Sequence, residues 1–220
     1  MLDEGIGHSD LLLAVAPIRF ITVGGMLAVT VFGNRAATKD IDFLLDPNVD
    51  AVQEYRDEVM RVIRDVAIAG NFNEDWMNDD FQIFVGRAKR PALFMQSVEQ
   101  GVIAYQGRNL LVYAGRLDFA LERKLRRISD PTDRARDIDL SDAITLVHWL
   151  KGDGGHPLGF EFVRNLDENQ IGMPIRREGI DRAAQEYIKV YRTQGIVDFV
   201  WDEEERRYKY LDLENNWVFV

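Results

Sequence analysis

The sequence has no cysteine among its 220 residues. This absence excludes disulfide bonds, thiolate zinc sites and cysteine nucleophiles, and it removes any need for an oxidising compartment. The apolar segment Leu11–Ala16 is too short to span a bilayer, and the acidic start MLDEGIGHSD supplies no basic region for a signal peptide. We therefore expect a cytoplasmic location and no membrane contact.

Two common catalytic signatures are also missing. No serine lies in a G-x-S-x-G elbow, and no G-K-[ST] of a P-loop is present, which argues against the hydrolases and P-loop proteins that carry them. The three histidines, His8, His148 and His156, do not have the spacing of metal ligands. His148 follows Val147 in an apolar stretch, which favours a packed histidine over a functional one.

Basic residues are fewer than acidic ones. The chain has 27 Lys and Arg against 37 Asp and Glu, so its formal net charge is −10. A surface of this sign repels a polyanion unless its basic residues are clustered. One cluster exists in residues 122–136 (ERKLRRISDPTDRAR), but aspartates within and beside it cancel part of its field. Nucleic acid is therefore a less favoured partner than a small molecule or a protein.

The most informative segment that is present runs from Ile21 to Leu45, ITVGGMLAVTVFGNRAATKDIDFLL. It reads as an apolar strand, a Gly24-Gly25 turn, a helix, and a second strand that carries Asp40 and Asp42. Residues two apart on a strand point to the same side, so the two carboxylates are expected to project together. Such a pair repels unless a cation lies between its members, and oxygen ligands suit Mg²⁺ or Mn²⁺. The glycines would let a phosphate approach backbone N–H groups at the start of the helix.

This pattern resembles the nucleotidyltransferase superfamily that includes DNA polymerase β, and most of all its minimal and toxin-type members. In those proteins Gly, Arg and Thr precede the Asp pair, and Gly33, Arg35 and Thr38 match them here. The resemblance covers roughly residues 18–150. The alternative is that the two glycines only permit tight packing of helix on strand and that both aspartates are solvated.

The resemblance implies a division of roles among these residues. The glycine turn would hold the triphosphate of an NTP, and the two aspartates would be catalytic and hold Mg²⁺ or Mn²⁺. Arg35 would contact phosphate or, equally, brace the turn. The implied nucleotide-binding residues of this segment are Gly24, Gly25, Arg35 and Thr38, and the implied metal ligands are Asp40 and Asp42.

A second segment, KLRRISDPTDRARDIDLSDAITLVHWL, resembles the helical region that follows the core in toxin-type nucleotidyltransferases. That region carries a Lys on one helix, then an Arg and spaced Asp residues on the next, and Lys124, Arg136, Asp139 and Asp142 match it. Lys124 would bind the nucleotide and neutralise charge that develops on pyrophosphate, with Asp139 and Asp142 orienting it. Two alternatives stay open: ordinary ion pairs on a solvated helix pair, and Asp137 as the functional acid.

Phosphoryl transfer with two metal ions generally needs a third carboxylate on a neighbouring strand. The strand expected there, FQIFV at residues 81–85, has no acid and carries Gln82 in its interior. Asp79 and Asp80 come immediately before it. We expect Asp80 to be the third catalytic acid, with Asp79 as the other possibility. If neither reaches the site, the domain would be catalytically inactive.

The hydrophobic pattern predicts a mixed α+β (α/β) fold: a small mixed sheet, a helical region beside it, and a C-terminal helix-plus-hairpin extension. The Gly-rich stretch 150–159 suggests a division into residues 1–151 and residues 152–220, the latter of unknown role. Helices are expected at 8–16, with Ser9 as N-cap, and at 49–69, 91–100, 117–128, 133–151, 160–168 and 179–193. Strands are expected at 81–85, 103–106 and 110–114, and in the stretches VDFVWD, RYKYLDLE and NWVFV. Gly107 is expected to join the strands 103–106 and 110–114 in a hairpin, and residues 130–132 are expected to form a turn.

These observations lead to two hypotheses of different class. The first is a metal-dependent enzyme that transfers a nucleoside monophosphate from an NTP to a small-molecule or protein acceptor. The second is a catalytically inactive nucleotidyltransferase-like domain that serves as a binding or scaffold module. The intact Gly-Gly and Asp-x-Asp patterns favour the enzyme, and the missing acid within FQIFV favours the module.

Overall fold

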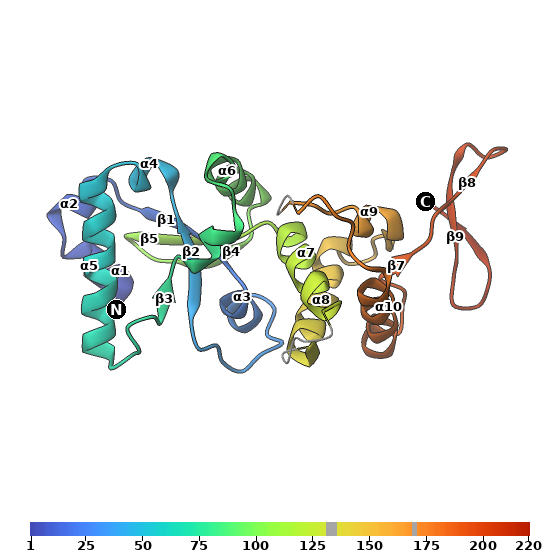
Figure 1. The fold of residues 1–220 in the computed structure, drawn as a ribbon, viewed down its shortest axis with the longest axis horizontal. Coiled ribbons are helices and arrows are strands. Elements are labelled where there is room, and N and C mark those ends of the chain that lie inside the picture. Colours follow the sequence, from blue (N-terminus) through green and yellow to red (C-terminus); the bar gives the residue numbers. More distant parts are fainter. Residues whose placement is uncertain (131–135, 169–170) are drawn as a thin grey trace. The chain divides into compact units, whose positions relative to one another are not determined.

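The computed structural model describes residues 1–130, 136–168 and 171–220, with only the backbone at Arg136. The described chain forms two compact units, Met1–Arg116 (unit 1) and Leu117–Val220 (unit 2). Each contains helices and strands (Figure 1), so the mixed α/β class is confirmed. The division lies between Arg116 and Leu117, whereas the sequence suggested it after residue 151.

Unit 1 is built on a mixed five-stranded sheet in the order β3-β2-β1-β5-β4. The central strand β1 pairs antiparallel with β2 and parallel with β5. β3 pairs parallel with β2, and β4 forms an antiparallel hairpin with β5, as predicted. The strands are β1 (Ile18–Val23), β2 (Ile41–Leu45), β3 (Met77–Asn78), β4 (Ile103–Gln106) and β5 (Leu110–Ala114).

The helices of unit 1 follow local sequence signals. Ser9 caps α2, since its hydroxyl accepts from the Leu12 N–H, as the sequence predicted. Asp46 caps α4 through the Asn48 N–H, and α5 buries one apolar face. The helices are α1 (Leu2–Gly7), α2 (Asp10–Leu13), α3 (Gly25–Thr30), α4 (Pro47–Asp50), α5 (Gln53–Gly70) and α6 (Arg90–Gln100), with 3₁₀ turns η1 (Asp80–Phe84) and η2 (Arg87–Lys89).

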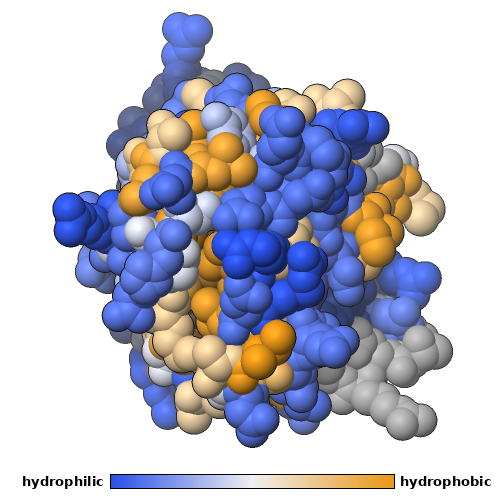
Figure 2. Space-filling model, turned by 90° about the vertical axis from the view of Figure 1, so that its left-hand side faces the viewer, coloured by the Kyte–Doolittle hydropathy of each residue, from blue (hydrophilic) through white to orange (hydrophobic). Residues whose placement is uncertain are grey.

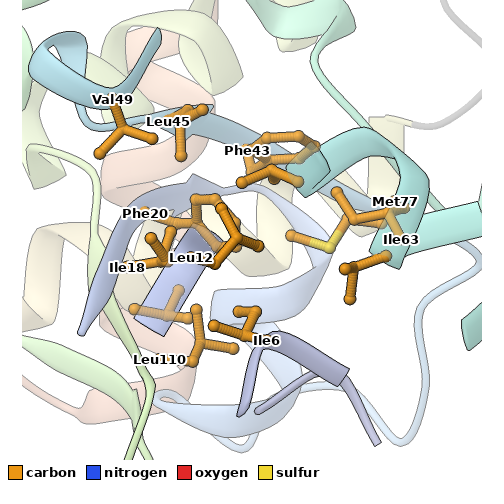
Figure 3. Packing of buried hydrophobic residues seen from close by; sticks show 13 residues of the cluster. Ile6, Leu12, Ile18, Phe20, Phe43, Leu45, Val49, Ile63, Met77 and Leu110 are labelled. Atoms are coloured by element: carbon orange, nitrogen blue, oxygen red, sulfur yellow. The ribbon is translucent and has the colours of Figure 1, made fainter. Parts of the chain in front are cut away.

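The main core of unit 1 lies between one face of the sheet and the helices α1, α2 and α5. Phe20 and Phe43 come from neighbouring strands, and their ring centroids lie 4.9 Å apart. Ile6 and Leu12 reach the same cluster from α1 and α2 (Figure 3). Side chains alternate along a strand, so this face takes every second residue of β1 and β2.

The other face of the sheet carries the alternate residues, including Arg19 and Asp42. Arg19 pairs with the buried carboxylate of Asp46, with its Nε 2.9 Å from Asp46 Oδ2. Its guanidinium lies 5.8 Å from the ring centroid of Phe94, a buried residue of α6. The helix α6 therefore covers part of the face to which Asp42 belongs.

Unit 2 is a helical assembly followed by a small sheet. α7 packs along α8, and α10 packs against both. β6 and β7 form a short parallel pair, and β8, β9 and β10 form an antiparallel meander, which agrees with the predicted C-terminal extension. The elements are α7 (Leu117–Ile128), α8 (Arg136–Lys151), β6 (Leu158–Gly159), α9 (Phe160–Arg164), α10 (Arg177–Tyr191), β7 (Ile196–Val197), β8 (Val200–Asp202), β9 (Arg207–Leu211) and β10 (Trp217–Phe219).

The predicted strand at 81–85 is wrong, because most of this segment forms the 3₁₀ helix η1. On a strand Phe81, Ile83 and Val85 would share one face. Here Phe81 and Val85 are buried while Ile83 is 81% exposed, which is a helical spacing. The predicted turn at Pro131–Thr132 and the start of the predicted helix at 133 lie outside the described residues.

The surface carries no large continuous apolar face in the view of Figure 2, where hydrophobic patches are separated by hydrophilic side chains. Within the described ranges, none of the helices combines the length and apolarity needed to cross a bilayer.

Candidate functional site

The Gly-Gly turn lies where β1 ends and α3 begins. Gly24 has φ +73° and ψ −132°, a conformation that L side chains rarely adopt, which explains the glycine. A Cβ at Gly24 would lie 3.4 Å from Asp42 Oδ2. Antiparallel pairing of Val23 with Asp42 produces this closeness. The Asp42 carboxylate therefore lies directly against the backbone of the turn.

The second glycine is in contact with the loop that precedes β2. A Cβ at Gly25 would lie 2.1 Å from Thr38 Oγ1 and 3.7 Å from Arg35 Nη1. The Thr38 hydroxyl donates to the Asp40 carbonyl at 3.0 Å, and the Arg35 N–H donates to the Ala28 carbonyl of α3. The loop is thus folded back onto the turn, with the side chains of Thr38 and Arg35 beside Gly25.

The two aspartates of the Asp-x-Asp pattern are held differently. Asp42 lies within β2, is half-buried, and its carbonyl accepts from the Thr22 hydroxyl at 2.7 Å. Asp40 is exposed and lies one residue before β2 begins. The two carboxylates were expected to project together because both were placed on one strand. Only Asp42 lies within the strand, and the loop before β2 sets the position of Asp40.

The candidate third acids lie just after β3. Asp79 Oδ2 accepts from Gln82 Nε2 at 3.0 Å and pairs with Arg56 Nη2 of α5 at 3.4 Å. Asp80 is exposed and begins η1. Gln82 is buried, and its side-chain oxygen accepts from Arg90 at 2.5 Å. The Asp79 carboxylate is thus held by side chains of α5 and η1, and Asp80 is exposed to solvent.

The residue directly opposite Asp42 on the neighbouring strand is Asn78, which the sequence analysis did not single out. Its Oδ1 accepts from the Asp80 N–H at 3.0 Å, so it fixes the chain where β3 turns into η1. The strand that pairs with β2 at Asp42 therefore presents an amide at this position, and the expected acids Asp79 and Asp80 come after it. The register of the two-residue β3 was not visible in the sequence, because so short a strand has no periodic signal.

Lys124 belongs to unit 2, where it is buried between α7 and α8. Its ammonium lies 2.6 Å from Asp139 Oδ1 and 2.7 Å from Asp142 Oδ2, and Asp139 Oδ2 also pairs with Arg127 Nε at 3.0 Å. Lys124 thus lies beside both aspartates that were expected to be able to orient it, and its proposed role in nucleotide binding stays a prediction. The exposed carboxylate of Asp137 instead pairs with Arg182 of α10 at 3.1 Å.

Mg²⁺ is commonly held by one or two carboxylates, with water and substrate phosphates completing the shell. Asp42 and Asp40 offer carboxylates of that kind, and the Asp42 carboxylate lies directly beside the backbone of Gly24. Within the described residues, no three His, Cys, Asp or Glu side chains gather closely enough to hold a metal by themselves. The residues therefore fit a metal that arrives with a nucleotide. No family model, curated protein or solved structure matches this chain.

Proposed function

We propose that unit 1 binds a nucleoside triphosphate with Mg²⁺ or Mn²⁺ and transfers its nucleoside monophosphate to an acceptor. The observation that carries this proposal is the convergence on the Gly-Gly turn, where Asp42 lies against Gly24 while Thr38 and Arg35 lie against Gly25. These are the residues that the resemblance to nucleotidyltransferases selects from the sequence.

Each group has a definite part in the proposed reaction. An acceptor hydroxyl or amine attacks the α-phosphorus, a new bond to phosphorus forms, the bond to the β-phosphate oxygen breaks, and pyrophosphate leaves with the electron pair. The acceptor proton passes to solvent or to Asp40, which is exposed. Asp42 and Asp40 would hold the metal, which supplies positive charge to the triphosphate. Arg35 would contact phosphate, and Thr38 positions the loop through the Asp40 carbonyl.

The acceptor is proposed to be a small molecule or a protein. A net charge of −10 opposes binding of a polyanion, which needs many Lys and Arg contacts to phosphate. It favours a cationic acceptor, because complementary charge raises the rate of encounter. Steeply salt-dependent, tight binding of tRNA in a gel-shift assay would overturn this choice of acceptor and leave the nucleotide site unaffected.

A second function, nucleotide binding without transfer, is favoured by one specific observation. Asp79, the acid nearest in sequence to β3, is already bound by Arg56 and Gln82. A domain that lacks a third carboxylate would hold the nucleotide and its metal but activate no acceptor. Such a domain would act as a sensor or scaffold that recognises the triphosphate.

Calorimetry with each of the four NTPs, with and without Mg²⁺, tests the site. We expect Mg²⁺-dependent binding that weakens at least tenfold in Asp42→Asn, because the variant loses the carboxylate beside Gly24. Asp57→Asn, on the exposed side of α5 where Gln53 is its partner, is the matched control and should bind as the wild type does. Equal binding by Asp42→Asn and the wild type would refute the site.

Release of pyrophosphate from labelled NTP over a panel of amines, aminoglycosides and basic proteins separates the two functions. Transfer that is lost in Asp42→Asn supports the enzyme. Binding without any transfer or pyrophosphate release across the panel would favour the second function. Asp80→Asn adds a direct test of the third acid, since an enzyme that uses Asp80 should lose transfer while it retains NTP binding.

A further inference from the structure

Unit 1 contains a cavity of about 260 Å³ between the sheet and the segments that cover it. Its floor is formed by strand residues such as Ile41, Phe43 and Val112. Its walls include three aromatic side chains from different parts of the chain: Phe72 after α5, Trp76 before β3, and Tyr105 of β4. Phe72 and Trp76 lie side by side, with ring centroids 5.1 Å apart, so the lining is largely aromatic and favours an apolar ligand.

The polar groups around this cavity are largely engaged already. The Thr22 hydroxyl donates to the Asp42 carbonyl, and Trp76 Nε1 donates to the Ile63 carbonyl at 3.2 Å. Asp3 Oδ1 accepts from the Asn109 N–H at 2.7 Å. The Tyr105 hydroxyl lies beside Gly107, close to Asp3, and makes no hydrogen bond within the described part of the chain. The cavity therefore offers apolar and aromatic surface with one available hydroxyl.

The cavity lies on the opposite face of β2 from the Asp42 side chain, although Met26, the residue after Gly25, also lines it. Ile41 and Phe43 line it, and alternation along β2 turns Asp42 to the opposite face of the sheet. Phe43 and Met77, both in the core cluster of Figure 3, also form part of its wall. A ligand here would contact the back of the strand that carries Asp42 and would not occupy the space beside Gly24.

The volume limits the ligand to a compact molecule. An apolar cavity of about 150 Å³ binds benzene, so about 260 Å³ has room for two fused rings. We propose that this cavity is a binding site for a small, flat, largely apolar aromatic molecule of one or two rings with a single hydroxyl or N–H group that the Tyr105 hydroxyl can meet.

The test uses 2-naphthol as the probe and full-length protein. Ligand-observed saturation-transfer NMR should detect binding, and the probe should raise the thermal midpoint in a concentration-dependent manner, because a ligand that binds only the native state stabilises it. Naphthalene, which lacks the hydroxyl, should bind several-fold more weakly. Glucose, which is compact but polar, should neither bind nor stabilise.

Two variants on α5 give a matched comparison. Val66→Phe places a ring in the cavity and should abolish the shift, whereas Ile68→Phe, at an 81% exposed position two residues away, should leave it intact. If Val66→Phe does not fold, Phe72→Ala replaces it. Phe72 is about half exposed, so its removal should spare folding and weaken 2-naphthol binding by several-fold up to about tenfold, as expected for one lost aromatic contact.

Absence of any 2-naphthol binding to the wild type would overturn the proposal. Equal stabilisation of the wild type and the Val66→Phe variant would also overturn it, because the probe would then bind elsewhere. Neither outcome depends on NTP binding, so the cavity and the nucleotide site can fail separately.

Discussion

The charged residues around the Gly-Gly turn of unit 1 and those around Lys124 of unit 2 look alike in sequence but differ in their surroundings. Asp42 is half-buried beside a bare glycine backbone, and Asp40 is exposed. Lys124, Asp139 and Asp142 are buried, and each is within 3 Å of an opposite charge. A motif of charged residues is therefore a candidate for ligand binding only when its charges are not already enclosed by opposite charges of the protein.

The energetics of the two regions differ for the same reason. A buried charge stripped of its partner is costly, because water cannot replace the partner. An exposed carboxylate that loses its partner is solvated by water, so the loss changes the free energy of unfolding little. Removal of Lys124 is therefore expected to destabilise unit 2 strongly, whereas removal of an exposed charge in the same unit is not.

The largest expected effect comes from breaking the buried cluster. Lys124→Met should lower the free energy of unfolding of unit 2 by about 3–5 kcal/mol, because it leaves two buried carboxylates without their shared cation. Lys189→Met, an exposed lysine of the same unit, should change it by less than about 1 kcal/mol.

Urea unfolding followed by fluorescence can assign these changes. Trp76 is the only tryptophan in unit 1, and the other three lie in unit 2. Variants with Trp76→Phe therefore report on unit 2 alone. If Lys124→Met proves no more destabilising than Lys189→Met, the buried cluster contributes no more to stability than an exposed ion pair does.

A smaller effect is expected from closing the space at the turn. Gly25→Ala would put a Cβ 2.1 Å from Thr38 Oγ1 and should destabilise unit 1 by about 1–3 kcal/mol through overpacking. Thr38→Ala in the same chain should recover part of this loss, because it removes the clashing oxygen. A double-mutant cycle by urea unfolding measures the recovery as a coupling energy.

Gly33 provides the control for that cycle. It has φ +67°, and no atom lies within 4 Å of the position that a Cβ would take there. Gly33→Ala should therefore cost backbone strain of about 1–2 kcal/mol and nothing from crowding. Thr38→Ala should not rescue Gly33→Ala. Rescue of both variants, or of neither, would show that crowding at Gly25 is not what the turn depends on.

The smallest effect concerns a surface charge outside both regions. Hydrogen bonds from Arg61 and then from Ser9 lower the pKa of Glu58 from 4.5 to about 2. Because the folded-state pKa is depressed, the stabilisation is present above about pH 4.5 and is lost as the pH falls towards 2. Glu58→Gln should remove this pH dependence. The stabilisation lost should be at most about 1 kcal/mol, which is the range for partly exposed ion pairs.

Stability curves of the wild type and Glu58→Gln measured between about pH 2 and about pH 6 provide the check. The free energies of unfolding of the two proteins should agree at the acidic end. Their difference should grow as the pH rises and reach its full size by about pH 4.5. Parallel curves over the whole range would mean that Glu58 gains nothing from Ser9 and Arg61 in the folded state.

Local signals in the sequence predicted much of the fold. The helix Leu117–Ile128 was predicted at its observed bounds, and the hairpin of β4 and β5 was predicted from two apolar runs around Gly107. Both have strong local determinants: an apolar stripe of helical period in the first and a glycine turn in the second. The segment FQIFV failed because a short apolar run does not distinguish a strand from a helical turn.

The candidate site was predictable only in part, for a similar reason. The turn, Arg35, Thr38 and Asp42 are close in sequence, and strand pairing brings them together. The engagement of Asp79 depends on Arg56 from α5, a contact over 23 residues that no local pattern encodes. The domain division was also hidden, because α10 packs against α7 and α8 from beyond the Gly-rich stretch.

The central position of β1 has a consequence for how the protein is made. β1 gains its parallel neighbour only from β5, which ends at Ala114, whereas β2 follows β1 within a short distance along the chain. A nascent chain emerging from the ribosome can therefore pair β1 with β2 early, but it must keep the other edge of β1 unpaired until almost all of unit 1 has been synthesised. The sheet of unit 1 can therefore be completed only after β5 has been synthesised, close to the end of this unit.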